Sequence, residues 1–243
     1  MKEMKPHIVL DLDNTLLCAE TLKDFPFSDM ALRQKALSLN FHNMDGYYIV
    51  FERPYLQPFL DFLFKNFDVS VWTAASKDYG LFVINKILLR NNTRQLKYYL
   101  FSYHCELSEK NYEYVKDLRI VTTFFNCIQN PLIIDDLREV YEAQPRNCIN
   151  IKAFRFMDPG SENDRELVKI QEFLSQYLKT PSAPPNTNPP NTTPLTSSIP
   201  PTGNTIPAPS TLTFPSTSIV TSNGLLPTVS GITLPSSIPV VNV

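Results

Sequence analysis

Three short apolar segments, each ending in an acidic or hydroxyl residue, constrain the fold of this chain most. They are residues 7–11, 68–73 and 131–136, and each is rich in β-branched or aromatic side chains. Short, continuous apolar runs of this kind are typical of strands that are buried on both faces of a parallel sheet. A fourth run, at residues 148–151, has the same character. The sequence therefore predicts a mainly parallel sheet.

Helical patterns lie between these runs. Apolar residues recur at helical spacing from Pro54 to Leu63, from Asp78 to Leu89 and from Asn163 to Leu178. Proline at position 54 suits the first residue of the first of these helices. Strands that alternate with helices favour a doubly wound α/β domain, in which helices flank the sheet.

Residues 39–51 interrupt this alternation. Asp45-Gly46 is a strong signal for a hairpin turn, and it lies between two apolar segments. We therefore expect a small β-flap, inserted between the first strand and the helix that follows Arg53.

Charge divides the chain into two parts. All 22 Lys and Arg residues and all 24 Asp and Glu residues lie within residues 1–179, whereas 14 of the 21 prolines lie from Pro181 onward. An uncharged segment rich in Pro, Ser and Thr cannot bury enough apolar surface to offset the entropy lost on ordering. We expect one folded domain at residues 1–179 and a disordered tail at residues 180–243.

Composition argues against several classes of function. The four cysteines are far apart with no CxxC pair, which favours reduced thiols over a zinc or redox site. A net charge of −2 argues against general nucleic-acid binding. We find no apolar run long enough for a signal-peptide core or a membrane span. The expectation is a monomeric intracellular protein, in the cytoplasm or the nucleus, without a nucleic-acid or membrane partner.

The residues that follow the predicted strands carry the candidate chemistry. Asp11 and Asp13 follow the first run, Thr73 ends the second, and Asp135 and Asp136 end the third. These side chains should converge, because ligands of open α/β sheets lie outside the carboxyl ends of the strands. Four carboxylates in one crevice repel one another unless a hard cation with oxygen ligands is bound. The pattern predicts Mg²⁺ and, since Mg²⁺ keeps positions for phosphate oxygens, phosphoryl transfer.

The Asp-Leu-Asp segment at residues 11–13 is the most informative. Two carboxylates at this spacing can divide the work, one attacking phosphorus and the other moving a proton. Taken alone, such a pair also occurs in turns and helix caps, and Thr73 alone could simply satisfy a strand end. The pair of Asp135 and Asp136 favours the catalytic interpretation, because adjacent carboxylates repel at a cost that a structural role does not require.

Five motifs together resemble one family. They are Asp11-Leu-Asp-Asn-Thr15, Arg53-Pro54, Val71-Trp-Thr-Ala-Ala75, Tyr114-Val-Lys-Asp-Leu118 and Leu132-Ile-Ile-Asp-Asp136. In order and spacing they are similar to the FCP/SCP group of haloacid-dehalogenase-like (HAD) phosphatases. This group, also called NLI-interacting-factor-like phosphatases, acts on phosphoserine and phosphothreonine in proteins. The resemblance covers residues 6–178 and leaves the tail outside.

The resemblance implies a role for each candidate residue. Asp11 would be the nucleophile that forms an aspartyl-phosphate, and Asp13 the general acid and base. Thr73 would bind the phosphoryl oxygens, and Lys116 would neutralise charge on the nucleophile and the transferred group. We interpret Arg53 as a structural residue near the site, with contact to the substrate as the alternative. Without the motif around it, Lys116 would be read as an ordinary solvated lysine.

The resemblance also implies a magnesium site. Its ligands would be the carboxylate of Asp11, the backbone carbonyl of Asp13 and the side chain of Asp136. Asp135 would support these ligands without binding the metal itself.

One position departs from the family pattern. Relatives that recognise a phosphoserine heptad usually carry an arginine shortly before a His-Cys pair, and here Ser102 precedes His104-Cys105. A neutral hydroxyl cannot make the bidentate, charge-assisted contact of an arginine. The sequence therefore leaves the substrate preference open, although it indicates the type of reaction. We expect His104, Cys105 and Trp72 to be packing residues.

The sequence thus predicts a Mg²⁺-dependent phosphoric monoester hydrolase that acts on phosphoserine or phosphothreonine in a phosphoprotein. One alternative is a HAD phosphatase for a nucleotide or sugar phosphate, but such enzymes usually carry a larger cap than the 37 residues between Thr15 and Arg53 provide. Another alternative is a catalytically weak scaffold member of the family, although a scaffold has no need to keep all the candidate residues.

Overall fold

The structure is a computed structural model that describes residues 5–90, 93–105, 116–125 and 128–179. The tail at residues 180–243 lies outside the described residues, so its disorder and the domain boundary at residue 179 stay predictions.

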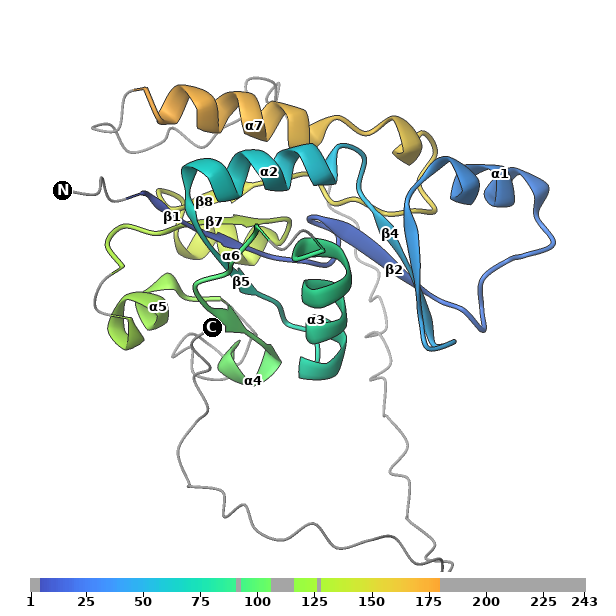
Figure 1. Ribbon diagram of the computed structural model, residues 1–243, viewed down its shortest axis with the longest axis horizontal. Coiled ribbons are helices and arrows are strands. Elements are labelled where there is room, and N and C mark those ends of the chain that lie inside the picture. The colour runs from blue at the N-terminus through green and yellow to red at the C-terminus, as the bar shows by residue number, and fades with distance from the viewer. Residues whose placement is uncertain (1–4, 91–92, 106–115, 126–127, 180–243) are drawn as a thin grey trace, which may run out of the picture. The chain divides into compact units, whose positions relative to one another are not determined.

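A five-stranded parallel sheet forms the centre of the domain (Figure 1). Its strands are β1 (His7–Leu10), β5 (Asp68–Trp72), β6 (Tyr99–Leu100), β7 (Leu132–Asp135) and β8 (Cys148–Asn150). They lie in the order β6-β5-β1-β7-β8, and every neighbouring pair is parallel. This arrangement confirms the α/β prediction and adds β6, which the sequence pattern did not indicate.

The central strand, β1, aligns the ends of its neighbours. Leu10 is level with Val71 of β5 and with Ile134 of β7. The residues that follow these three strands therefore leave the sheet at one edge, where ligands of open α/β folds bind.

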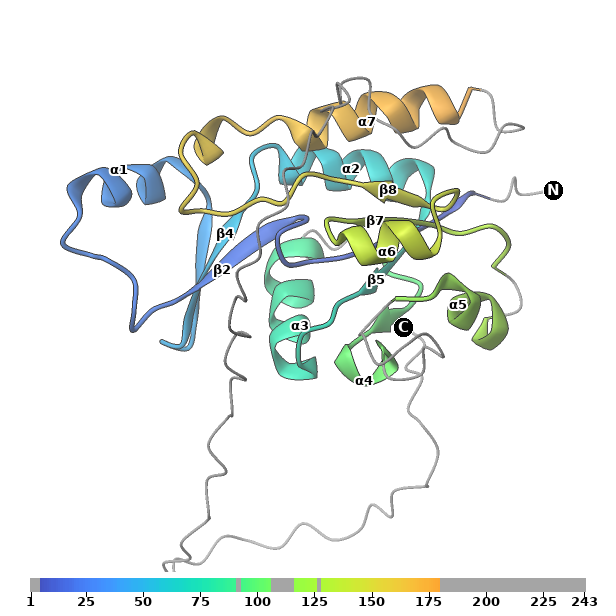
Figure 2. The ribbon, with the colours of Figure 1, turned by 180° about the vertical axis from the view of Figure 1, so that it is seen from behind.

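Helices cover both faces of the sheet (Figures 1 and 2). They are α2 (Leu56–Asn66), α3 (Lys77–Val83), α4 (Ser102–Cys105), α5 (Leu118–Phe124), α6 (Arg138–Ala143) and α7 (Glu166–Tyr177). Ile8 and Leu10 join the core beneath α2, α3 and α7, whereas Val9 joins the opposite core with α5 and α6. This division follows from the alternation of side chains along a strand.

The helix ends differ from the sequence expectation. Helix α2 begins at Leu56 instead of Pro54, because Tyr55 has a left-handed backbone (φ 67°) and an exposed ring. The helix expected at residues 78–89 begins as α3 and continues as a π-helix at Ile84–Leu88. A short 3₁₀ turn, Ser161–Asn163, precedes α7, so that helix begins at Glu166.

The predicted β-flap is present and is larger than expected. Its strands are β2 (Leu17–Thr21), β3 (Phe41–Met44) and β4 (Tyr48–Glu52), which form an antiparallel sheet in the order β2-β4-β3. Asp45 and Gly46 have φ angles of 49° and 81°, as a type I′ turn requires. Helix α1 (Met30–Ser38), which was not predicted, lies between β2 and β3 in the chain.

In the part of the chain that the structure describes, no helix is both long enough and apolar enough to span a bilayer.

Candidate active site

The chain turns sharply where it leaves β1. The amide of Asp11 donates to the carbonyl of Ile134 (3.1 Å), which extends the pairing of β1 with β7 by one residue. The amide of Thr15 then donates back to the carbonyl of Leu12 (3.3 Å). Asn14 has a left-handed backbone (φ 60°), which asparagine tolerates better than most residues. This turn holds both carboxylates of the Asp-Leu-Asp segment at the edge of the sheet.

Lys116 lies at the centre of the acidic cluster. Its ammonium group donates to Oδ1 of Asp11 and, at 2.8 Å, to Oδ2 of Asp135. The side chain is 1% exposed. Burial alone would lower the pKa of Lys116, but the two carboxylates outweigh burial and hold that pKa above its ordinary value. Lys116 is therefore a permanently charged cation bound to two acids, and it is not a solvated surface lysine.

The acidic pair at the end of β7 has two different environments. Asp135 is fully buried, and besides the bond from Lys116 it accepts one from the amide of Leu137 (2.9 Å) on Oδ1. Asp136 is less buried, and its Oδ1 accepts a hydrogen bond from the hydroxyl of Thr15 (3.3 Å). Burial and the charge of Asp11 raise the pKa of both carboxyls. Burial is the larger of the two causes, and repulsion from Asp11 adds to it.

Asp13 has a partner that the sequence did not indicate. The hydroxyl of Tyr79, in the first turn of α3, donates to Oδ1 of Asp13 at 2.5 Å. Burial raises the pKa of Asp13 to about 6, and the hydrogen bond from Tyr79 limits that rise. A carboxyl group with such a pKa can both give and take a proton near neutral pH.

Thr73 lies just past the end of β5 and is buried. Its amide donates to the carbonyl of Leu100 (3.0 Å), and its hydroxyl oxygen accepts from the amide of Ala75 (3.0 Å). The hydroxyl thus has a local structural role, which was the alternative for this residue. Because a hydroxyl is a donor as well as an acceptor, its proton is still available to a ligand oxygen.

Three carboxylates could hold a cation. Asp11, Asp135 and Asp136 each offer one oxygen, and these three oxygens lie within 4.8 Å of one another. Both oxygens of Asp135 already accept protein hydrogen bonds, whereas Asp11 and Asp136 each have one engaged on Oδ1 only. The oxygen ligands and their charge fit a hard divalent cation. The arrangement fits Asp11 and Asp136 as direct ligands better than Asp135.

The contacts of Arg53 favour its structural interpretation over a contact with substrate. Its guanidinium group is buried and donates to both oxygens of Asp164 (2.9 Å each), to the carbonyl of Thr15 (2.9 Å) and to the carbonyl of Lys152 (2.8 Å). These four bonds engage all three nitrogens of the guanidinium group, which supports a structural role for Arg53. It holds the turn after β1 against the segment that follows β8.

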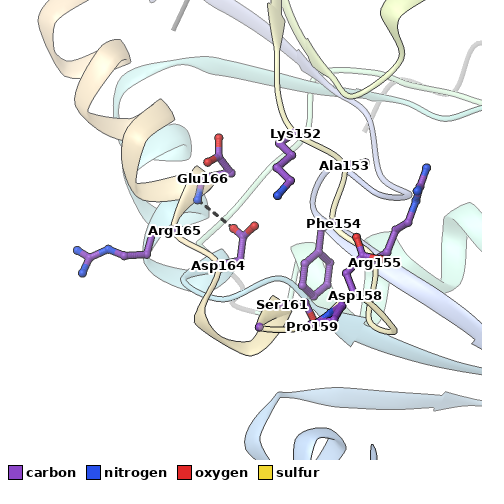
Figure 3. A pocket seen from close by; sticks show the side chains of 11 residues that line it. Lys152, Ala153, Phe154, Arg155, Asp158, Pro159, Ser161, Asp164, Arg165 and Glu166 are labelled. Atoms are coloured by element: carbon purple, nitrogen blue, oxygen red, sulfur yellow. Dashed lines mark hydrogen bonds between the residues drawn. The ribbon is translucent and has the colours of Figure 1, made fainter. Parts of the chain in front are cut away.

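A pocket of about 200 Å³ is lined in part by Lys152 and Asp164, two partners of Arg53, and by none of the predicted site residues (Figure 3). It is lined by residues 152–155, 158–161 and 164–166. Figure 3 shows the guanidinium groups of Arg155 and Arg165 extending away to opposite sides, so the basic side chains do not converge on one point. The candidate chemistry therefore lies at the acidic cluster, outside this pocket.

The other residues named from sequence are placed as follows. Trp72, His104 and Cys105 are buried, which agrees with their interpretation as packing residues. The sequence interpretation missed Tyr79, because a tyrosine within an apolar helical pattern looks like a core residue. It also missed the side chain of Asn150, which donates to the carbonyls of Asp135 (3.2 Å) and Asp136 (3.3 Å).

Comparison with known proteins agrees with this geometry. The family model of the NLI interacting factor-like phosphatases matches residues 6–183. The CTD phosphatase-like protein 355R of Invertebrate iridescent virus 6 is 42% identical over 181 residues, which cover 71% of this chain and 98% of the viral protein. The CTD nuclear envelope phosphatase 1B of Danio rerio is 30% identical over 174 residues, which cover 69% of this chain and 64% of the fish protein.

A solved structure has the same fold. The structure of Fcp1, described as an essential RNA polymerase II CTD phosphatase, matches with a TM-score of 0.53 at 17% identity. The match covers 72% of this chain and 62% of the Fcp1 chain. The family model spans most of this chain, and the viral relative is matched over nearly its whole length. The chain therefore belongs to the family of NLI interacting factor-like phosphatases.

Proposed function

We propose that this phosphatase removes phosphate from phosphoserine or phosphothreonine in a protein, that it requires Mg²⁺, and that Asp11 is its nucleophile. The observation that carries the proposal is the contact of Lys116 with both Asp11 and Asp135, beside Asp13 and Asp136. The buried ammonium group of Lys116 restrains Asp11, while the negative charge of the other carboxylates is not balanced by a further cation among the described residues. Such an arrangement suits a site that receives a metal ion and a phosphate group.

The residues divide the reaction into two steps. In the first step Asp11 attacks phosphorus, the bond to the ester oxygen breaks, and Asp13 gives a proton to that oxygen. In the second step water attacks phosphorus and gives a proton to Asp13, the bond between phosphorus and the Asp11 oxygen breaks, and phosphate leaves the regenerated Asp11 carboxylate. A carboxyl with a pKa of about 6 suits both transfers. Lys116 orients Asp11 throughout, and the hydroxyl of Thr73 can donate to a phosphoryl oxygen.

A magnesium ion would be held by Asp11, Asp136 and the backbone carbonyl of Asp13, and when bound it would supply positive charge for the phosphate oxygens. The two carboxylates fit this role, because each has an oxygen without a protein hydrogen-bond donor among the described residues. Asp135 is committed to Lys116 and Leu137, which supports its role behind the ligands.

Two observations favour a protein substrate over a small metabolite. The insertion between Thr15 and Arg53 forms only the three-stranded flap and α1, which is a small cover for a site that must enclose a metabolite. The relatives named as CTD phosphatases point to phosphorylated protein segments as the substrate class of the family. Serine or threonine esters are the phosphate groups that we propose for this chain.

The test is hydrolysis of p-nitrophenyl phosphate and of a phosphoserine peptide, each with and without Mg²⁺. We expect turnover of both substrates, lost when the metal is chelated and restored when Mg²⁺ is added back. Turnover of the aryl ester alone, with an activity toward sugar or nucleotide phosphates, would contradict the proposed substrate class. Undiminished turnover after chelation would contradict the metal requirement.

A further inference from the structure

Tyr79 makes a contact in the site that the mechanism above does not use. Its hydroxyl donates to Oδ1 of Asp13 at 2.5 Å. Among the described residues, no other side chain donates a hydrogen bond to this carboxylate. The contact therefore distinguishes the two oxygens of Asp13: Oδ1 is held by the tyrosine, and Oδ2 is left to exchange a proton.

The backbone of α3 fixes Tyr79 from one side. Ser76 caps the helix, and its hydroxyl oxygen accepts a hydrogen bond from the amide of Tyr79 (3.4 Å). The next residue, Gly80, lies so close to Phe101 that a Cβ atom there would come within 2.6 Å of the ring, and within 3.4 Å of the methyl group of Thr73. The first turn of α3 is thus packed directly against the loop that carries Thr73.

The flap fixes Tyr79 from the other side. The ring of Tyr48, in β4, meets the ring of Tyr79 edge-on, with centroids 6.0 Å apart and an interplanar angle of 75°. Aromatic pairs favour this T-shaped geometry. Tyr79 is 8% exposed, so water has little access to its hydroxyl and does not readily replace Asp13 as the hydrogen-bond acceptor. The same residue contacts both the flap and the acidic site.

We propose that Tyr79 is a positioning residue that orients Asp13 for proton transfer to the leaving group, with Oδ2 as the transferring oxygen. This inference rests on the proposed function. When the bond between phosphorus and the ester oxygen breaks and the bond to Asp11 forms, the proton on Oδ2 moves to the departing oxygen. When water attacks the phosphorus of the aspartyl-phosphate, a proton of the water moves to Oδ2, and the bond to Asp11 breaks to release phosphate. Oδ1 can accept the bond from Tyr79 in both states, so the restraint persists through the cycle.

Two phosphate esters of similar size separate orientation of a general acid from a merely structural role. p-Nitrophenolate departs with little protonation, whereas the phenolate of phenyl phosphate gains more from a proton donor. A positioned general acid contributes roughly 10²–10⁴-fold to a rate. We expect Tyr79→Phe to lower kcat/KM for phenyl phosphate about tenfold more than kcat/KM for p-nitrophenyl phosphate.

Tyr48→Phe is the matched control, because it removes a neighbouring hydroxyl and keeps the ring contact. It should leave the ratio of the two kcat/KM values at the wild-type level. Partial unfolding of a variant cancels in this ratio, because both esters are measured on one preparation. An unchanged ratio in Tyr79→Phe would overturn the inference and leave the phosphatase proposal intact. A wild-type protein that hydrolyses neither ester would overturn the proposed function, and the inference with it.

Discussion

Lys116 and Arg53 are both buried cations, but their surroundings differ. Those of Lys116 suit an active site, and those of Arg53 suit a structural ion pair. Each residue is 1% exposed. The guanidinium group of Arg53 is satisfied within the chain, by the carboxylate of Asp164 and by two backbone carbonyls. The ammonium group of Lys116 contacts two carboxylates, Asp11 and Asp135, and further carboxylates lie beside them.

The balance of charge explains the difference. One arginine against one carboxylate leaves no net charge to be neutralised, so the pair needs no ligand. One lysine among several carboxylates leaves a negative surplus in a buried place, where burial first and repulsion from Asp11 second raise the pKa of the other carboxyls. Burial of a charged residue alone therefore indicates little about function, whereas the unbalanced set of carboxylates around Lys116 is the kind of site that we propose for a cation.

The largest expected effect is on turnover, at the unbalanced cluster. Asp11→Asn should lower kcat for p-nitrophenyl phosphate by at least about 10³-fold, because an amide cannot act as the nucleophile. Its melting temperature should equal or exceed that of the wild type, since the change removes one of the repelling charges. Both quantities can be measured on the same purified protein. Turnover close to wild type would exclude Asp11 as the nucleophile.

The next effect is on stability, at the balanced pair. Arg53→Met should lower the free energy of unfolding by about 3–5 kcal/mol, because it leaves Asp164 and two carbonyls without their donor. Denaturant titration measures this loss. The matched control is Arg138→Met, which breaks an exposed pair with Glu142 and should cost about 0.3–0.5 kcal/mol. Equal losses of unfolding free energy in the two variants would show that burial does not make the contacts of Arg53 more stabilising than an exposed ion pair.

A smaller effect is expected on metal affinity. Asp136→Asn should raise the Mg²⁺ concentration for half-maximal turnover by more than the roughly 10–100-fold that is typical when a residue supporting a metal ligand is lost, since here a charged ligand itself becomes neutral. Asp158→Asn is a suitable control, because that carboxylate is exposed and lies in the pocket of Figure 3. Asp135→Asn should act more on turnover than on the metal titration. Superimposable metal titrations of the Asp136 variant and the wild type would remove Asp136 from the metal site.

Most of the fold was predictable because it depends on continuous local patterns. The strands β1, β5, β7 and β8 are short segments of mainly apolar residues, and Asp45-Gly46 marks the flap turn. Strand β6 has two residues and is too short to make a pattern. Helix α1 exposes Met30 (65%) and Leu37 (71%), so its apolar residues do not mark a buried face.

The candidate site was predictable only where it follows the strands. Asp11, Asp13 and the acidic pair lie directly after strand ends, where the fold brings residues together whatever their separation in sequence. The partners of these residues come from elsewhere: Tyr79 is 66 residues from Asp13, and Asp164 is 111 residues from Arg53. No spacing rule connects such pairs, so the sequence indicated a structural role for Arg53 near the site without identifying Asp164 as its partner.

The smallest expected effect is a gain in selectivity for one phosphopeptide when the residue at position 102 is changed. Replacement of Ser102 by arginine adds a cation that, unlike Lys116 and Arg53, has no fixed partner. The amide of Ser102 donates to the carbonyl of Ala75 (3.1 Å), so this residue lies next to the loop that carries Thr73. A hydrogen bond to a charged group contributes about 1.5–3 kcal/mol, and the lower end of this range corresponds to a change of about tenfold in kcat/KM. Ser102→Arg should therefore raise kcat/KM for an RNA polymerase heptad phosphopeptide about tenfold and leave p-nitrophenyl phosphate turnover unchanged. Ser102→Gln, which adds length without charge, is the control and should give no gain. An equal gain with glutamine, or none with arginine, would show that charge at this position does not determine which phosphopeptide is hydrolysed.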